Sequence, residues 1–214
     1  MRVGVIDYGV GNLGSVVRAL EELRVAPKLL TNPAELKSVD RLILPGVGNF
    51  ADCARLLNEG GWPPRLKEAV LSETKPLLGV CVGMQLLANL SREGLSPQDD
   101  DKAGSIGLGL IPGRVVHLRD LGCKHRVPHV GWNSIQLPTT RDKLLNGIPD
   151  STDFYFVHSF AFIAEQASDI LATADYGIPI AAVIGKANVW GTQFHPEKSS
   201  KAGFKLLSNF IEEV

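Results

Sequence analysis

A cysteine flanked by two glycines stands where an apolar, strand-like run gives way to a helix-like one. The residues Gly79-Val80-Cys81-Val82-Gly83 form the pattern of a nucleophile elbow, with cysteine in place of serine. The glycines allow a tight turn, and the N-terminus of a following helix favours the negative charge of a thiolate. The N–H of Val82 would point at a developing oxyanion. The pattern predicts Cys81 as a nucleophile, whereas Cys53 and Cys123 lack such flanks and are expected to be structural.

A cysteine nucleophile needs a base, and the base needs a group that orients it. Both are present in Gly191-Thr192-Gln193-Phe194-His195-Pro196-Glu197, at the end of a second strand-like run. Glu197 can accept a hydrogen bond from one imidazole nitrogen of His195 while the other nitrogen faces the sulfur. We therefore predict a triad of Cys81, His195 and Glu197. The alternative at this point is that both Cys81 and His195 are structural residues.

Two further glycine-rich turns follow predicted strands. The turn Pro45-Gly46-Val47-Gly48-Asn49-Phe50 would lie at the same sheet edge as Cys81 and can offer a second oxyanion donor, although an ordinary strand-to-helix turn explains it equally well. The turn Gly9-Val10-Gly11-Asn12-Leu13-Gly14 matches the dinucleotide fingerprint G-x-G-x-x-G. Residues 29–34 lack the acidic residue that this fingerprint requires. We therefore disfavour a nicotinamide or flavin site and expect a tight turn there, or a contact with another chain.

The first half of the chain alternates between strand-like and helix-like segments. We expect a helix capped by Asn12 after the first strand. Strands alternating with helices imply a parallel sheet that is covered on both faces. The strands are predicted at 3–7, 28–31, 41–44 and 77–81, and further helices at 51–57, 65–71 and 84–90.

The second half is richer in short β-like runs and ends in a predicted helix over 202–212. A two-residue hairpin turn is expected at Gly185-Lys186. We expect one α/β domain over residues 1–214, with a mostly parallel central sheet flanked by helices and an additional smaller β region in the second half. The predicted β runs are 114–118, 134–137, 154–157, 170–174, 180–184 and 187–194.

The composition argues against several classes of protein. The chain carries 22 basic and 23 acidic residues, a net charge of −1, which disfavours a nucleic-acid binder that relies on bulk positive charge. Three cysteines without paired spacing indicate neither a disulfide framework nor a zinc site. No apolar run approaches the roughly 18 residues of a membrane span, and the N-terminal apolar stretch is too short for a signal peptide. We expect a cytoplasmic protein with reduced thiols and no metal or other cofactor.

The order Cys81, His195, Glu197, within GVCVGMQLL and GTQFHPEKS, resembles the triad of class I glutamine amidotransferases. Further motifs resemble one family among them, the glutaminase subunits of imidazole glycerol phosphate synthase, which act in histidine biosynthesis. The related anthranilate synthase subunits share the triad but lack several of these motifs. The motifs run nearly end to end: DYGVGNLGSV at 7–16, LPGVGNF at 44–50, GLGLIPGRV at 107–115, PHVGWN at 128–133 and YFVHSF at 155–160.

The resemblance implies an enzyme that hydrolyses L-glutamine to glutamate and ammonia. Cys81 would attack the side-chain amide to form a γ-glutamyl thioester, His195 would transfer the protons, and Glu197 would orient His195. The backbone N–H groups of Val47 and Val82 would form the oxyanion hole. The substrate-binding positions that the resemblance implies are Gly48, Gln85, Glu93 and Ser159.

The resemblance also implies a heterodimer with a cyclase subunit of (β/α)8-barrel fold, and no nucleic-acid or membrane partner. Ammonia would pass along a sealed path to this subunit, which forms imidazole glycerol phosphate and aminoimidazole carboxamide ribonucleotide. The sealed path would keep the ammonia from becoming non-nucleophilic ammonium. The positions implied at or near the subunit interface are Val10, Asn12, Trp132, Tyr155 and Lys198.

Some residues depart from the family pattern. Val80 and Val82 replace the more usual Ile and Leu around the nucleophile, Phe160 stands where tyrosine is common, and the segment 96–105 is longer and more acidic than expected. Two alternatives remain open: a catalytically silent binding module on the same fold, and the glutaminase subunit of another amidotransferase. The intact Cys-His-Glu set favours an enzyme over a silent module.

Overall fold

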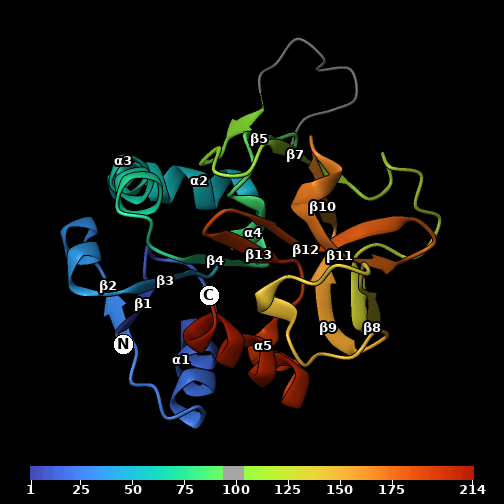
Figure 1. The fold of residues 1–214 in the computed structure, drawn as a ribbon. Helices are drawn as coiled ribbons and strands as arrows, with labels where there is room; N and C mark the ends of the chain where they lie inside the picture. The colour runs from blue at the N-terminus through green and yellow to red at the C-terminus, as the bar shows by residue number, and fades with distance from the viewer. Residues whose placement is uncertain (94–103) are drawn as a thin grey trace.

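The computed structural model describes residues 1–93 and 104–214, so most of the acidic segment 96–105 lies outside the described residues. These described residues form a nine-stranded sheet of order β2-β1-β3-β4-β13-β12-β11-β8-β9 and a four-stranded sheet of order β10-β7-β5-β6. Figure 1 shows α1 and α5 on one face of the large sheet, with α2, α3 and the small sheet on the other.

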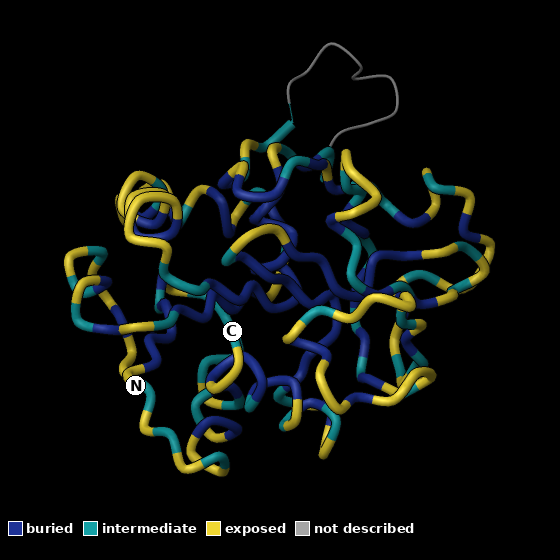
Figure 2. The backbone as a smooth tube through the Cα atoms, in the orientation of Figure 1, coloured by how far each residue is buried: buried dark blue, intermediate teal, exposed yellow. Residues whose placement is uncertain are grey.

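One half of the large sheet is parallel, as expected. Its strands pair in parallel throughout, and three of the five are fully buried apolar runs of the kind that a sheet covered on both faces requires. Figure 2 shows buried backbone running through the middle of the molecule, between layers with exposed outer faces. These strands are β1 (Val3–Ile6), β2 (Lys28–Leu30), β3 (Arg41–Leu44), β4 (Leu77–Val80) and β13 (Val189–Thr192).

The other half of the large sheet is antiparallel; the strand pattern predicted the hairpin that pairs its first strand with β13, but not the remaining pairs. Four strands continue the sheet beyond β13: β12 (Pro179–Lys186), β11 (Ile170–Asp175), β8 (His129–Gln136) and β9 (Asp153–His158). The small sheet is the expected second β region and contains β5 (Leu90–Ser91), β6 (Ser105–Ile106), β7 (Gly113–His117) and β10 (Phe160–Ala164). The strand β10 is not among the predicted β runs, and Ser159 is the residue at which the chain passes from one sheet to the other.

The helices bury one side against the sheet. The helix α1 buries Val16, Ala19 and Leu20, which is the apolar spacing of an amphipathic helix. The longest described helix has 13 residues, and no helix in the described ranges is both long and apolar enough to cross a membrane. The helices are α1 (Leu13–Glu22), α2 (Phe50–Glu59), α3 (Trp62–Lys67), α4 (Val82–Gln85) and α5 (Ser200–Glu212).

The helix expected over 84–90 is much shorter in the structure. It is the single turn α4, after which the chain passes into β5. The carbonyls of Leu86, Leu87 and Ala88 accept hydrogen bonds from backbone N–H groups of residues 108–111 instead of continuing the helix. Tertiary hydrogen bonds therefore end this helix, and no neighbouring residue in the sequence predicts them.

The hairpin turn expected at Gly185-Lys186 is also wrong. Lys186 pairs with Val189, so the turn is Ala187-Asn188, and Ala187 adopts a positive φ of 54°. The Asn188 side chain donates hydrogen bonds to the carbonyls of Val70 and Lys75. These long-range bonds favour a turn at 187–188 even though a glycine-first dipeptide lies two residues earlier.

Candidate active site

Cys81 occupies the sharp turn between β4 and α4. Its backbone has φ 55° and ψ −111°, a strained conformation for a residue with a side chain. The backbone N–H of Cys81 donates to the Thr192 carbonyl at 2.8 Å, and its sulfur lies 3.8 Å from the Val157 carbonyl. The side chain is 4% exposed. The predicted elbow is therefore present, with the sulfur held where two neighbouring strands end.

The two glycines beside Cys81 are required by close backbone packing. A Cβ on Gly83 would lie 1.9 Å from the Leu44 carbonyl oxygen, and a Cβ on Gly79 would lie 2.6 Å from the Gly83 carbonyl oxygen. Real Cβ atoms do not approach backbone this closely. The turn can therefore sit against the end of β3 only because both residues are glycine.

His195 and Glu197 follow the end of β13. Nδ1 of His195 lies 2.8 Å from Oε1 of Glu197, with the two side chains 3% and 1% exposed. Burial lowers the pKa of His195, but hydrogen bonds and charge interactions with Cys81 and Glu197 outweigh it and raise this pKa to about 9. Oε2 of Glu197 is buried and forms no hydrogen bond within the described residues. The hydrogen bond of the Glu197 carboxylate is therefore to His195, and its negative charge stabilises the protonated, imidazolium form of that side chain.

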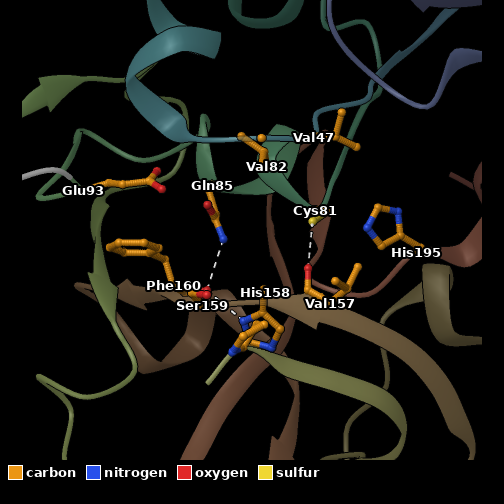
Figure 3. Close-up of a pocket in the computed structure, with 12 residues that line it drawn as sticks. Val47, Cys81, Val82, Gln85, Glu93, Val157, His158, Ser159, Phe160 and His195 are labelled. Atoms are coloured by element: carbon orange, nitrogen blue, oxygen red, sulfur yellow. Dashed lines mark hydrogen bonds between the residues drawn. The ribbon is translucent and has the colours of Figure 1, made fainter. Parts of the chain in front are cut away.

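Strand pairing brings the sulfur and the imidazole together. In the parallel pair β4–β13, Val80 lies opposite Thr192, so Cys81 and His195 both follow the carboxyl ends of adjacent strands. The backbone N–H of His195 donates to the Tyr155 carbonyl at 3.0 Å, which ties this turn to β9. Figure 3 shows the imidazole of His195 beside the sulfur of Cys81. The predicted catalytic residues are thus brought to one place from distant parts of the chain.

The triad opens onto a cavity of about 310 Å³. All the predicted oxyanion and substrate positions line it: Val47, Val82, Gly48, Gln85, Glu93 and Ser159. Oε2 of Glu93 accepts a hydrogen bond from the backbone N–H of Phe50 at the start of α2, while burial raises the pKa of this carboxyl group. In the part of the chain that the structure describes, no group of three or more His, Cys, Asp or Glu residues is placed to hold a metal ion.

Part of the cavity wall is formed by residues that the motifs did not predict as site residues. Pro128, Val157, His158 and Phe160 also line the cavity, and the buried Gln193 connects Gln85 to the sulfur. Gln85 Nε2 donates to Gln193 Oε1 at 3.1 Å, and Gln193 Nε2 lies 4.0 Å from the Cys81 sulfur. Each of these residues stands inside or beside a motif already singled out, which is the only sequence signal that could have found them.

A pair of neutral histidines supports the part of the cavity wall formed by His158 and Phe160. Nδ1 of His158 donates to the Phe160 carbonyl at 2.8 Å, and Nε2 of His158 lies 2.9 Å from Nδ1 of His129. Burial lowers the pKa of His129 to about 4 and that of His158 to about 3. The same Phe160 carbonyl accepts the Nε2 amide of Gln85 at 3.1 Å. The histidine pair therefore fixes the acceptor that orients Gln85; Figure 3 shows His158 and Gln85 on either side of this carbonyl.

The five positions expected at a subunit interface lie outside this cavity. Trp132 and Tyr155 are direct cross-strand partners of β8 and β9, with ring centroids 6.1 Å apart. Trp132 and Val130, on the same face of β8, are each 55% exposed. Lys198 is exposed, while Val10 and Asn12 are partly buried in the loop after β1.

The whole chain is similar to known proteins. Residues 4–214 match the family described as Glutamine amidotransferase class-I. The chain is 48% identical to the imidazole glycerol phosphate synthase subunit HisH of Desulfitobacterium hafniense (strain DSM 10664 / DCB-2), over 97% of this chain and 92% of the relative. It is 44% identical to the subunit of the same name of Geobacillus sp. (strain WCH70), over 99% and 97%. A crystal structure of a glutamine amidotransferase superimposes with a TM-score of 0.73 over 98% of this chain and 97% of the other, at 21% identity, and supports the fold.

Proposed function

The chain belongs to the class I glutamine amidotransferase family, and we propose that it is the glutaminase subunit of an imidazole glycerol phosphate synthase. In this role it hydrolyses L-glutamine to glutamate and ammonia for histidine biosynthesis. The observation that carries the proposal is the juxtaposition of Cys81, His195 and Glu197 at the ends of adjacent strands, facing a cavity. A catalytically silent module would not need this set.

The first half of the reaction forms the thioester. A protonated His195 beside the sulfur favours the thiolate of Cys81. The thiolate attacks the amide carbon of glutamine, and the backbone N–H groups of Val47 and Val82 stabilise the oxyanion that develops on the amide oxygen. His195 then gives its proton to the amide nitrogen, which leaves as ammonia, and the γ-glutamyl thioester remains on Cys81.

The second half regenerates the enzyme. His195, now neutral, takes a proton from water, and the resulting hydroxide attacks the thioester carbonyl. The same two N–H groups stabilise the second oxyanion. Collapse of this intermediate breaks the C–S bond, releases glutamate and leaves the Cys81 thiolate beside the His195 imidazolium. Glu197 orients the imidazole through Nδ1 and stabilises its positive charge in both halves.

Substrate binding is assigned to polar groups of the cavity wall. The carboxylate of Glu93 suits the α-ammonium group of glutamine, because charges of opposite sign attract strongly where burial excludes water. Gly48, Gln85 and Ser159 surround the remaining space. We propose that this contact makes the site prefer glutamine, which carries an α-ammonium group, over a simple amide, which lacks one.

The proposed partner is a cyclase subunit, to which the glutaminase delivers ammonia within a heterodimer. We propose that this subunit has a (β/α)8-barrel fold and that Val10, Asn12, Trp132, Tyr155 and Lys198 lie at the interface. The exposed apolar side chains of Trp132 and Val130 support this assignment, since large exposed apolar groups mark protein interfaces. Three unpaired cysteines support a reducing compartment such as the cytoplasm.

A glutaminase assay with and without the cyclase subunit tests the proposal. The wild-type heterodimer is expected to release glutamate from glutamine, and Cys81→Ser is expected to remove this activity while the heterodimer still assembles. Cys123→Ser is the matched control, because Cys123 is equally buried but lies outside the cavity. Absence of hydrolysis by the wild-type heterodimer, or full activity of Cys81→Ser, would refute the assignment.

A further inference from the structure

Two side chains outside the cavity hold the loop that carries Val47. The hydroxyl of Tyr8 donates to the Pro45 carbonyl at 3.0 Å, and the thiol of Cys53 donates to the Val47 carbonyl at 3.4 Å. Tyr8 stands just after β1 and Cys53 lies near the start of α2. They are 6% and 1% exposed and neither lines the cavity.

The two hydrogen bonds lie on either side of one peptide group. The Pro45 carbonyl belongs to the 45–46 peptide, and the Val47 carbonyl belongs to the 47–48 peptide. Between them is the Gly46–Val47 peptide, which carries the Val47 N–H. Among the described residues, neither the Gly46 carbonyl nor the Val47 N–H forms a hydrogen bond. The orientation of this N–H therefore depends on how its two neighbours are held.

Close packing against α4 restricts movement of the loop on that side. A Cβ on Gly46 would lie 2.6 Å from the backbone nitrogen of Gly83 and 2.9 Å from Cβ of Val82. The loop backbone thus touches the start of α4, which carries the other proposed oxyanion donor. Tyr8 and Cys53 also influence each other's pKa, so the two side chains that hold the loop are close neighbours.

Both groups stay neutral donors at working pH. Burial raises the pKa of Tyr8 and the pKa of Cys53. A protonated phenol and a protonated thiol each have one hydrogen to donate. This state is the one that the two carbonyl contacts require.

We propose that Tyr8 and Cys53 are positioning residues for glutamine hydrolysis, which fix the peptides beside Gly46–Val47 and so direct the Val47 N–H at the oxyanion. The inference rests on the proposed function, in which this N–H is an oxyanion donor. Such a contact gains strength only as charge develops in the transition state, so misalignment lowers kcat and leaves KM nearly unchanged.

Three variants and two matched controls test the inference in the heterodimer with the cyclase subunit. Tyr8→Phe and Cys53→Ala remove the two donors, while Cys53→Ser keeps a donor. The controls are Tyr176→Phe and Cys123→Ala, because the Tyr176 hydroxyl donates to the Arg126 carbonyl at 2.7 Å and the Cys123 thiol donates to the Tyr176 carbonyl at 3.4 Å, both away from the cavity.

We expect kcat for glutamine to fall about 3- to 30-fold in Tyr8→Phe and Cys53→Ala, less than the roughly 10²- to 10³-fold loss when an oxyanion donor is removed outright. KM is expected to change little, Cys53→Ser to lie closer to wild type than Cys53→Ala, and the controls to match wild type. Values of kcat for Tyr8→Phe and Cys53→Ala equal to the controls would overturn the inference.

A second measurement separates loop positioning from general damage to the site. Iodoacetamide alkylates a thiolate by forming a C–S bond as iodide leaves, and no oxyanion develops. The rate of alkylation at Cys81, followed by mass spectrometry, is therefore expected to be unchanged in Tyr8→Phe and Cys53→Ala. A parallel fall of alkylation and kcat would overturn the positioning role. A wild-type heterodimer that alkylates but does not hydrolyse glutamine would instead overturn the proposed function, and this inference with it.

Discussion

The imidazole Nδ1 of His195 lies 2.8 Å from Oε1 of Glu197, and both side chains are almost completely buried. The short 3₁₀ turn Pro196–Lys198 makes this contact possible two residues apart in the chain. Because Nδ1 is engaged by the carboxylate, Nε2 is the nitrogen left for the Cys81 sulfur. The pair therefore sets both the orientation and the charge of the base.

The first prediction concerns the charge of this pair. Glu197→Gln is expected to lower kcat for glutamine about 10²-fold, at the lower end of acid–base contributions. The pKa of His195 is raised to about 9, so the imidazolium that protonates the leaving ammonia is lost as pH rises through that value. Removing the carboxylate lowers this pKa, and the alkaline limb of kcat/KM should move to lower pH. Asp169→Asn, a buried carboxylate outside the cavity, should leave the limb in place; an unmoved limb in Glu197→Gln would contradict the assigned role.

The second prediction separates the two chemistries of the heterodimer. With ammonium salts supplied at alkaline pH, the heterodimer that carries Cys81→Ser should still form imidazole glycerol phosphate, because free ammonia replaces the product of the glutaminase. The measurement is cyclase turnover with ammonia and with glutamine as the nitrogen source. Loss of both activities would mean that Cys81 also supports assembly or cyclisation.

The third prediction concerns glycine packing at the nucleophile. Gly83→Ala places a Cβ 1.9 Å from a backbone oxygen, so it should destabilise the fold by about 3 kcal/mol or more, at the upper end of overpacking costs. Gly14→Ala lies in α1 with open space around its Cβ and should stabilise the chain by roughly 0.5–1 kcal/mol. Urea unfolding of the two variants provides the comparison, and equal midpoints would show that the elbow tolerates a side chain.

The fourth prediction concerns the exposed face of β8. Val130→Glu places a charge beside Trp132 and should weaken the heterodimer by at least about 10-fold in Kd, because a buried unpaired charge is costly at an interface. Leu71→Glu is the control, since Leu71 is also a large exposed apolar side chain, at 62% exposure, but lies far along the chain beside α3. Titration calorimetry with the cyclase subunit measures both, and equal Kd values would place the interface elsewhere.

The fifth prediction concerns acid stability. In the folded protein the pKa values of His129 and His158 are lowered to about 4 and 3, below the unfolded value near 6.5. Between these values the unfolded chain binds more protons, so the free energy of unfolding should fall as pH drops from about 6.5 toward 4. His129→Gln should flatten this dependence, whereas His125→Gln, at an exposed histidine, should not. The measurement is urea unfolding of these variants at several pH values. An unchanged pH dependence of the unfolding midpoint in His129→Gln would contradict the assignment of a neutral histidine pair.

The family, the activity and the parallel half of the sheet could be predicted from the sequence, because they depend on contiguous residues. The glycines around Cys81 and the segment from Gly191 to Glu197 each specify a local backbone shape that short-range sterics dictate. The strand β3 was predicted to the residue, since a turn beginning with Pro45 ends it. The relatives at 44–48% identity confirm the family that these motifs resemble.

The tertiary structure alone decided how those motifs meet. No local pattern indicates that β13 pairs with β4, yet this pairing brings His195 to Cys81. The antiparallel strands, the early end of α4 and the histidine pair likewise depend on contacts between residues far apart in the chain. Such contacts form only when the chain collapses around a shared core, where burial and hydrogen-bond satisfaction override local preference. The catalytic residues and their chemistry could therefore be predicted from the sequence, whereas the arrangement that brings these residues together at the cavity could not.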